Sequence, residues 1–137
     1  MRKLTRRDFL RQTGTALILS SAMPQLIHAE SCRIPVLLYH DISEQFRDDY
    51  TIAPSLFAAH MEMLYAEGYK TVRFSQLPAL QKDCEKRVII TFDDGYASFM
   101  DYCFPLLKEY RFSAAINIVG KFMGTFISSG GNRPMLS

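Results

Sequence analysis

The sequence predicts an α/β fold built around a parallel sheet. Short apolar segments of strand length alternate along the chain with segments whose apolar residues recur at helical spacing. The most apolar of the short segments, Val88–Phe92, has no polar face, and a strand of this kind belongs in the middle of a sheet. Its carboxyl end therefore opens onto the edge where α/β proteins build their sites, and Asp93-Asp94-Gly95 follow there.

The first strand and the first helix are expected on either side of a polar loop. Ile34–Tyr39 is short and apolar and ends at His40-Asp41, and the loop continues to Tyr50. Pro54 then begins a helix, because proline is favoured in a first helical turn, and Gly68 ends it. The residues that recur at helical spacing in this segment are Leu56, Phe57, Ala59, His60, Met63 and Leu64.

The middle of the chain predicts a second strand, a short helix and the central strand. Tyr69–Val72 has strand composition, and Ser75 can cap a short helix that continues through Leu80. Lys82–Lys86 is a polar turn. Arg87–Phe92 then forms the third and most clearly predicted strand.

The last third predicts a kinked helix, a fourth strand and a turn-rich tail. Apolar residues recur at helical spacing over Ala97–Tyr110, but Pro105 lies inside and should kink or break this helix. Ala114–Val119 is the fourth strand, and Gly120–Gly124 is a loop. Residues 128–134 are rich in Ser, Gly, Asn and Pro and resemble a series of turns.

Residues 1–29 have the pattern of an export signal. Arg6-Arg7 precede Phe-Leu and a moderately apolar run, Thr13–Ile27, which is followed by a small residue, Ala29. The paired arginines resemble the twin-arginine class, which predicts recognition by the twin-arginine export machinery and a periplasmic or extracellular location. The alternative is an amphipathic helix or a membrane anchor, but Gly14 and Pro24 interrupt the run and leave it too short to span a bilayer.

Charge and cysteine content exclude some classes of function. The whole chain has sixteen basic and fourteen acidic residues, but residues 30–137 have eleven basic and thirteen acidic ones. Nucleic-acid binding would need a clustered basic face, and nothing in this charge balance suggests one, so it is not expected. Cys32, Cys84 and Cys103 share no metal-binding spacing, and the sequence leaves open which pair, if any, is oxidised. Cys103 is expected in the core, and the oligomeric state is not predicted.

The two adjacent carboxylates, Asp93 and Asp94, predict a bound cation. Burying both costs several kcal/mol unless a positive charge compensates them, and no nearby arginine or lysine is suited to that role. A divalent metal ion is the natural compensation. The alternative is that these residues only cap the following helix. A magnesium-dependent phosphotransferase is disfavoured, because the chain has neither a phosphate-binding loop nor the Asp-x-Asp spacing usual for such sites.

Thr91–Tyr96 resembles the first motif of the polysaccharide deacetylases, the carbohydrate esterases of the NodB type. The surrounding segments agree in order, so the resemblance covers about residues 34–137 and is more specific than a lone Asp-Asp-Gly. The opening strand together with His40 is most similar to the exported poly-N-acetylglucosamine deacetylases. The segments that carry the resemblance are Pro35–His40, Phe57–Gly68, Phe104–Lys108 and Ala114-Ala115.

This resemblance implies an irregular (β/α) barrel and metal-assisted hydrolysis of acetyl groups on an N-acetylhexosamine polysaccharide. It implies that Asp93 is the general base, that Asp94 binds the metal ion, and that His40 is the general acid for the leaving amine. The alternative for His40 is a structural hydrogen bond to a loop carbonyl. Mixed carboxylate and imidazole ligation favours zinc as the divalent ion.

The family completes its metal site with a later His-Ser/Thr-x-x-His motif, which does not occur before Ser137. Residues 30–137 are therefore expected to form the N-terminal portion of the barrel, incomplete at the C-terminus, with half of the site. Two hypotheses remain open. One is a polysaccharide deacetylase, or the N-terminal part of one, and the other is a catalytically inactive fragment or glycan-binding remnant.

Other polar and aromatic residues are expected to have structural roles. His60 should be packed or exposed on its helix, and Tyr39 and Tyr96 should be half-buried core residues rather than a sugar-stacking surface. Asp48 and Asp49 are expected in a solvated loop. Asn132–Pro134 are expected to be a tail, although in a complete barrel Arg133 could orient a carboxylate.

Overall fold

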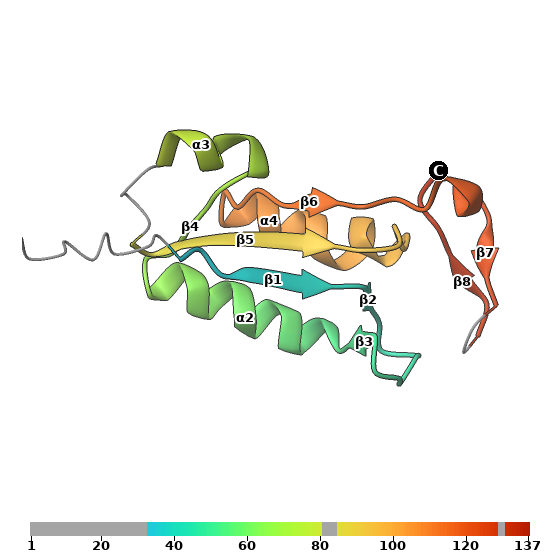
Figure 1. Cartoon of the computed structure of the whole chain (residues 1–137). Helices are drawn as coiled ribbons and strands as arrows, with labels where there is room; N and C mark the ends of the chain where they lie inside the picture. The colour runs from blue at the N-terminus through green and yellow to red at the C-terminus, as the bar shows by residue number, and fades with distance from the viewer. Residues whose placement is uncertain (1–32, 81–84, 129–130) are drawn as a thin grey trace, which may run out of the picture. The chain divides into compact units, whose positions relative to one another are not determined.

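The computed structural model describes residues 33–80, 85–128 and 131–137, and in these a parallel four-stranded sheet packs against helices (Figure 1). The α/β prediction is confirmed. The predicted signal, residues 1–29, lies outside the described residues, as do Cys32 and Cys84. No helix in the described part of the chain has the length and apolar character needed to span a membrane.

The strands form one main sheet and two small ones. The main sheet contains β1 (Val36–Tyr39), β4 (Lys70–Thr71), β5 (Arg87–Phe92) and β6 (Ala115–Ile116). The smaller sheets are a parallel pair, β2 (Asp41–Ile42) and β3 (Thr51–Ile52), and an antiparallel pair, β7 (Phe126–Ile127) and β8 (Arg133–Pro134). The sequence pattern did not predict either small sheet.

The helical elements are two longer helices and several short turns. They are α2 (Pro54–Ala66), the 3₁₀ turn η1 (Phe74–Gln76), α3 (Leu77–Leu80), the π-helical turn η2 (Phe99–Cys103), α4 (Phe104–Glu109) and the 3₁₀ turn η3 (Gly120–Phe122). The expected cap at Ser75 is wrong. The Gln76 side chain caps this turn instead, because its Oε1 accepts a hydrogen bond from the Arg73 backbone N–H at 2.8 Å.

Strand β5 is the centre of the main sheet, as predicted. It pairs with β1 along one edge, where Val36 lies opposite Ile89, and with β4 and then β6 along the other edge. Five of its six residues are buried. A strand hydrogen-bonded on both edges and buried on both faces has no place for a charge before its end.

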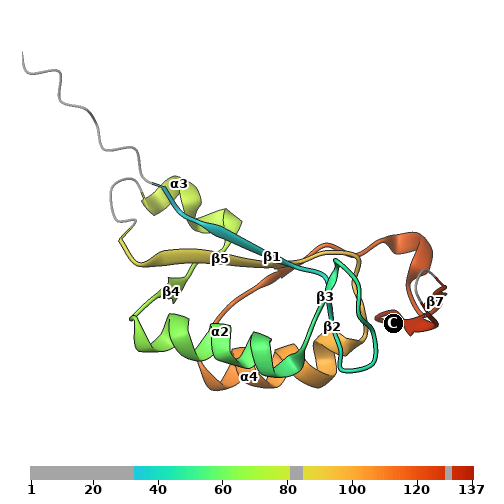
Figure 2. The same cartoon turned by 90° about the horizontal axis from the view of Figure 1, so that it is seen from below.

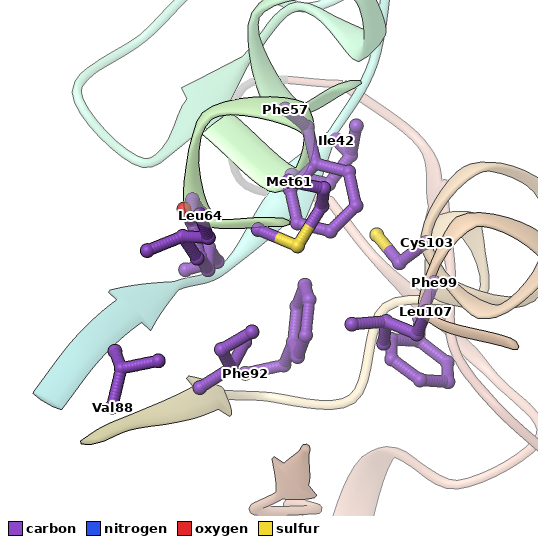
Figure 3. Close-up of a cluster of buried hydrophobic side chains, with 11 residues drawn as sticks. Ile42, Phe57, Met61, Leu64, Val88, Phe92, Phe99, Cys103 and Leu107 are labelled. Atoms are coloured by element: carbon purple, nitrogen blue, oxygen red, sulfur yellow. The ribbon is translucent and has the colours of Figure 1, made fainter. Parts of the chain in front are cut away.

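The hydrophobic core lies between the sheet and the helices α2 and α4, which cover one face of the sheet (Figures 2 and 3). The Tyr39 ring packs edge-on against Phe57, with 5.2 Å between ring centroids, and the Tyr39 hydroxyl contacts His60 Nδ1 at 3.1 Å. Cys103 is fully buried, as predicted, and burial raises the pKa of its thiol to about 12. The core side chains are Tyr39, Ile42, Phe57, Met61, Leu64, Val88, Ile90, Phe92, Phe99, Cys103 and Leu107.

The helix predicted over residues 97–110 was expected to kink or break at Pro105; it runs without a gap, but its winding changes from π-helical to α-helical just before this residue. It divides into η2 and α4, and Pro105 lies in the first turn of α4. Proline has no N–H to donate and its ring would clash with the carbonyl group four residues earlier. The wider π-helical turn before it is consistent with this need for space.

The C-terminal segment is part of the fold, so the expectation that Asn132–Pro134 form a free tail is wrong. Arg133 is 2% exposed and lies in β8. The Leu136 backbone N–H donates to the Gly95 carbonyl at 2.9 Å, and the Ala97 N–H donates to the Pro134 carbonyl at the same distance. The segment therefore closes over the loop that follows β5.

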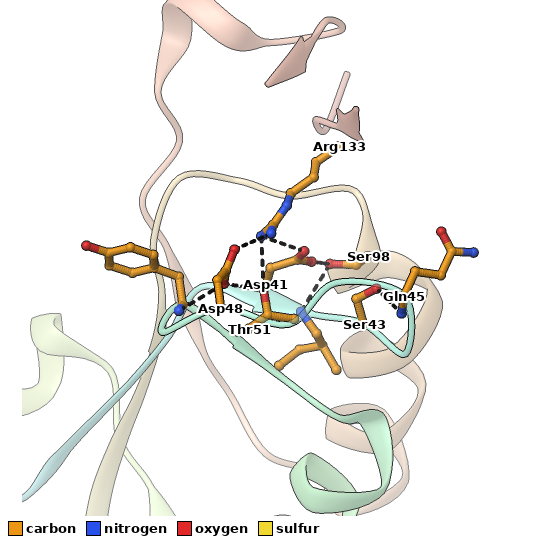
Figure 4. Close-up of polar contacts among 9 residues, drawn as sticks. Asp41, Ser43, Gln45, Asp48, Thr51, Ser98 and Arg133 are labelled. Atoms are coloured by element: carbon orange, nitrogen blue, oxygen red, sulfur yellow. Dashed lines mark hydrogen bonds and ion pairs between the residues drawn. The ribbon is translucent and has the colours of Figure 1, made fainter. Parts of the chain in front are cut away.

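Arg133 joins this segment to the loop after β1 through a buried ion-pair network (Figure 4). Its Nη1 lies 3.2 Å from Asp41 Oδ2 and donates to Thr51 Oγ1 at 2.9 Å, while its Nη2 pairs with Asp48. Ser98 donates to the other Asp41 oxygen at 2.6 Å. Asp48 is exposed, as expected for a solvated loop, but its pairing with Arg133 was not predicted.

Aromatic rings and hydroxyl groups complete the environment of this network. The Arg133 guanidinium lies 4.4 Å from the centroid of the Phe46 ring and 5.8 Å from that of Tyr96. The Thr51 hydroxyl, with smaller contributions from Arg133, lowers the pKa of Asp48. The network therefore holds three segments together: the loop after β1, the loop after β5 and β8.

Substituting Gly68 should destabilise the chain through its backbone alone. Gly68 has φ +75° and ends α2, where the Tyr69 N–H donates to the Leu64 carbonyl at 2.8 Å. A Cβ at Gly68 would meet no atom within 4 Å. Gly68→Ala should lower the free energy of unfolding by about 1 kcal/mol, measured by urea denaturation. Gly120, which also has open space around it, is the control: Gly120→Ala should cost much less.

Substituting Arg133 should be far more costly than breaking an exposed ion pair of equal length. Arg133→Met should lower the free energy of unfolding by about 3 kcal/mol, because it leaves the Asp41 carboxylate buried without its cation. Lys86 Nζ also lies 3.2 Å from its partner, Glu67, but the two side chains are 46% and 63% exposed. Lys86→Met should therefore cost less than about 1 kcal/mol.

A double-mutant cycle directly measures the energetic coupling between Asp41 and Arg133. In an Asp41→Asn background, Arg133→Met should cost clearly less than it does alone, because no buried charge is then left unpaired. Equal losses for Arg133→Met and Lys86→Met would show that the buried network does not stabilise the fold.

Candidate active site

The carboxyl ends of β1 and β5 bring His40 and Asp93 to the same edge of the sheet. Tyr39 is the register partner of Phe92, and the next residue along β5, Asp93, donates its backbone N–H to the Tyr39 carbonyl at 2.9 Å. His40 follows Tyr39 directly. The loops that follow β1 and β5 therefore lie side by side in the structure.

The loop after β5 has an unusual backbone. Asp94 has φ +69° and Gly95 has φ +83°. A non-glycine residue in the left-handed region is uncommon, although Asp tolerates it better than most, and such strain clusters at functional sites. A Cβ on Gly95 would also lie 3.3 Å from the Ile118 side chain, so this position is both strained and crowded for any other residue.

The Asp93 side chain has one defined partner. Asn117 Nδ2 donates a hydrogen bond to Asp93 Oδ1 at 2.7 Å. Among the described residues, neither Asp93 nor Asp94 accepts a backbone N–H through its carboxylate, and η2 has no side-chain cap. The alternative in which the two carboxylates only cap the next helix is therefore not observed.

Asn117 is a residue that the sequence interpretation missed. It lies one residue beyond β6, and its backbone N–H donates to the Phe92 carbonyl at 2.8 Å. The sequence did contain an indication of its role, because Asn117 is the single polar side chain in the apolar run Ala114–Val119. Polar residues at the carboxyl ends of neighbouring parallel strands share one edge of the sheet.

Tyr39, Tyr96 and His60 have structural roles in the fold, as predicted. Tyr39 and Tyr96 are 8% and 9% exposed, so both belong to the interior rather than to a sugar-stacking surface. Burial raises the pKa of Tyr96, and the nearby Asp94 charge raises it further, which keeps the phenol neutral. His60 is packed against Tyr39, as expected.

His40 is half-buried, and its ring centroid lies 5.2 Å from that of Tyr50. Within the described residues, the imidazole makes no hydrogen bond, so the alternative of a structural bond to a loop carbonyl is not observed. The ring is thus held by an aromatic contact, with both of its nitrogens available to a ligand.

The described residues do not fit a complete catalytic zinc site. Such a site normally uses three protein ligands, and no group of three His, Cys, Asp or Glu side chains suited to a metal ion occurs in residues 33–80, 85–128 and 131–137. Asp94 is a carboxylate with no partner among these residues and could supply one ligand.

Comparison with known proteins identifies the family. Residues 80–130 match the family model described as polysaccharide deacetylase. Over 96 residues the chain is 35% identical to YxkH of Bacillus subtilis, whose name assigns it provisionally to the polysaccharide deacetylases. This match covers 67% of the chain and 34% of YxkH.

A second relative has a named substrate. The chain is 28% identical over 93 residues to the poly-beta-1,6-N-acetyl-D-glucosamine N-deacetylase of Escherichia coli K12, a match that covers 64% of this chain and 14% of that protein. The chain thus spans about a third of the length of one curated relative and about a seventh of the other.

Comparison with solved structures points to the same family. IcaB from Ammonifex degensii superposes with a TM-score of 0.63 at 25% identity, covering 76% of this chain and 44% of IcaB. The Streptococcus pyogenes deacetylase PplD, solved with acetate, superposes with a TM-score of 0.57 at 28% identity, covering 72% of this chain and 47% of PplD. With the Asp-Asp-Gly loop at the carboxyl end of β5, these matches show that the chain belongs to the polysaccharide deacetylase family.

Proposed function

We propose that this chain provides the part of a metal-dependent hydrolase that carries Asp93 and Asp94, and that the hydrolase removes acetyl groups from an N-acetylhexosamine polysaccharide. The observation that carries the proposal is the placement of both carboxylates on a strained loop at the carboxyl end of β5, within a segment of deacetylase sequence. The named substrate of the Escherichia coli relative supports the choice of polymer.

Each proposed role follows from the chemistry of its side chain. Asp93 is the general base, which takes a proton from the attacking water, and its Oδ1 is already fixed by Asn117. His40 is the general acid, which gives a proton to the leaving amine, and its nitrogens are uncommitted among the described residues. Asp94 is a ligand of a divalent metal ion, with zinc as the expected ion.

The proposed function extends to architecture and location. The parallel sheet with helices on one face supports the N-terminal portion of an irregular (β/α) barrel. Residues 1–29 are proposed as a twin-arginine-type signal, which would deliver the protein to the periplasm or the extracellular space, where acetylated polysaccharides are found.

A second candidate function is a catalytically inactive, glycan-binding form. The two candidates differ in a measurable way, because the first predicts release of acetate when the remaining ligands are supplied and the second predicts sugar binding without turnover.

A chimera tests the first candidate. The matched segment of the Escherichia coli deacetylase is replaced by the corresponding residues of this chain, and acetate release from N-acetylglucosamine oligomers is measured with zinc and with a chelator. We expect release that depends on zinc. Asp93→Asn should reduce the rate by about 100-fold or more, because it removes the proton acceptor. Asp94→Asn should weaken zinc binding as well as activity.

The control is Asp49→Asn, which changes an exposed aspartate with no side-chain partner among the described residues. It should leave acetate release unchanged. A folded chimera that binds the oligomers but releases no acetate would favour the glycan-binding candidate. Full activity in Asp93→Asn would exclude Asp93 as the base.

A further inference from the structure

We propose that Asn117 is a positioning residue that orients the Asp93 carboxylate, an inference that rests on the proposed role of Asp93 as the base. A carboxylate at the end of a side chain rotates easily, because its last torsion has a broad two-fold profile. A fixed donor on one oxygen removes this freedom. The Asn117 amide supplies such a donor at 2.7 Å.

The sheet itself determines this contact. Phe92 and Ile116 are register partners in β5 and β6, and the Asn117 backbone N–H donates to the Phe92 carbonyl at 2.8 Å. The next residue of each strand, Asp93 and Asn117, therefore lies at the same level. Side chains at paired positions of neighbouring strands point to the same face. Two backbone contacts thus bring the amide to the carboxylate before any ligand is present.

The geometry leaves one carboxylate oxygen for chemistry. Asn117 occupies Oδ1, and among the described residues no group donates to Oδ2. An amide is suited to this role because it donates without carrying charge, so it holds the carboxylate and leaves it negative. Asp93 Oδ2 is then the oxygen that would accept the proton from water.

Asparagine-selective ¹⁵N labelling of the full chain tests the contact. Asn117 and Asn132 are the two asparagines of the sequence, so two side-chain amide signals are expected. The Asn117 amide protons should exchange with water about tenfold more slowly than those of Asn132, because a bond to a carboxylate must first open. Asp93→Ala should abolish this protection, whereas Asp94→Ala should leave it intact.

A second measurement follows the ¹³C signal of the Asp93 carboxylate. In Asn117→Leu, which has a similar size but no donor, the ¹³C carboxylate signal of Asp93 should shift, and Asn117→Gln should recover part of its original position. The matched control, Asn132→Leu, should leave that signal unchanged. Equal exchange of the two amides in the folded chain, or an Asp93 signal indifferent to Asn117→Leu, would overturn the proposal.

These measurements need no turnover, so they are independent of the acetate assay. If the amide of Asn117 is protected by Asp93 but the chimera keeps its activity in Asp93→Asn, the proposed function of Asp93 fails while the positioning contact stands. If the assay supports Asp93 as the base but Asn117 shows no protection, the positioning proposal fails alone.

Discussion

The burial of β5 on both faces is the constraint on which the rest of the structure depends. This strand is hydrogen-bonded along both edges, and its side chains fill the core and the opposite face of the sheet, so charged residues can follow only where it ends. The same end is where β1 and β6 also stop. The sheet thus gathers His40, Asp93 and Asn117 at one edge without any direct sequence relation among them.

The second constraint is electrostatic and connects distant parts of the chain. Asp41 and Arg133 are separated by 92 positions and meet as a pair that is 3% exposed on each side. A buried pair of this kind is weak as a source of net stability, but losing one partner is costly. We expect its effect to be specificity of arrangement, because separating the loop that follows His40 from the segment that closes over Gly95 would break this pair.

The sequence predicted regular elements better than long-range polar contacts. Hydrophobic spacing located α2 and β5, and the rule against internal proline located the irregular winding next to Pro105, because these signals depend on local geometry. Arg133 was expected in a tail and Asp48 in a solvated loop, and their pairing was missed, since nothing near either residue in the chain indicates its partner. Such pairing depends on which loops the fold brings together. Asn117 was indicated locally, as a polar residue in an apolar run. Predicting that its partner is Asp93 would also have required the strand register.

The pairing pattern also indicates from which side a ligand could reach the candidate site. Residues of β1 alternate between the two faces of the sheet: Leu37 and Tyr39 pack toward the core with α2, whereas Val36 and Leu38 are 51% and 55% exposed. Continuing this alternation places the His40 side chain on the face of Val36 and Leu38. That face is opposite the one covered by α2 and α4 (Figure 2). Asp93 and Asn117 directly follow Phe92 and Ile116, which are register partners, and Phe92 is the partner of Tyr39, so the same alternation places their side chains on that face. His40, Asp93 and Asn117 therefore share one face of the sheet at its carboxyl end, and this face is opposite to the one that α2 and α4 cover.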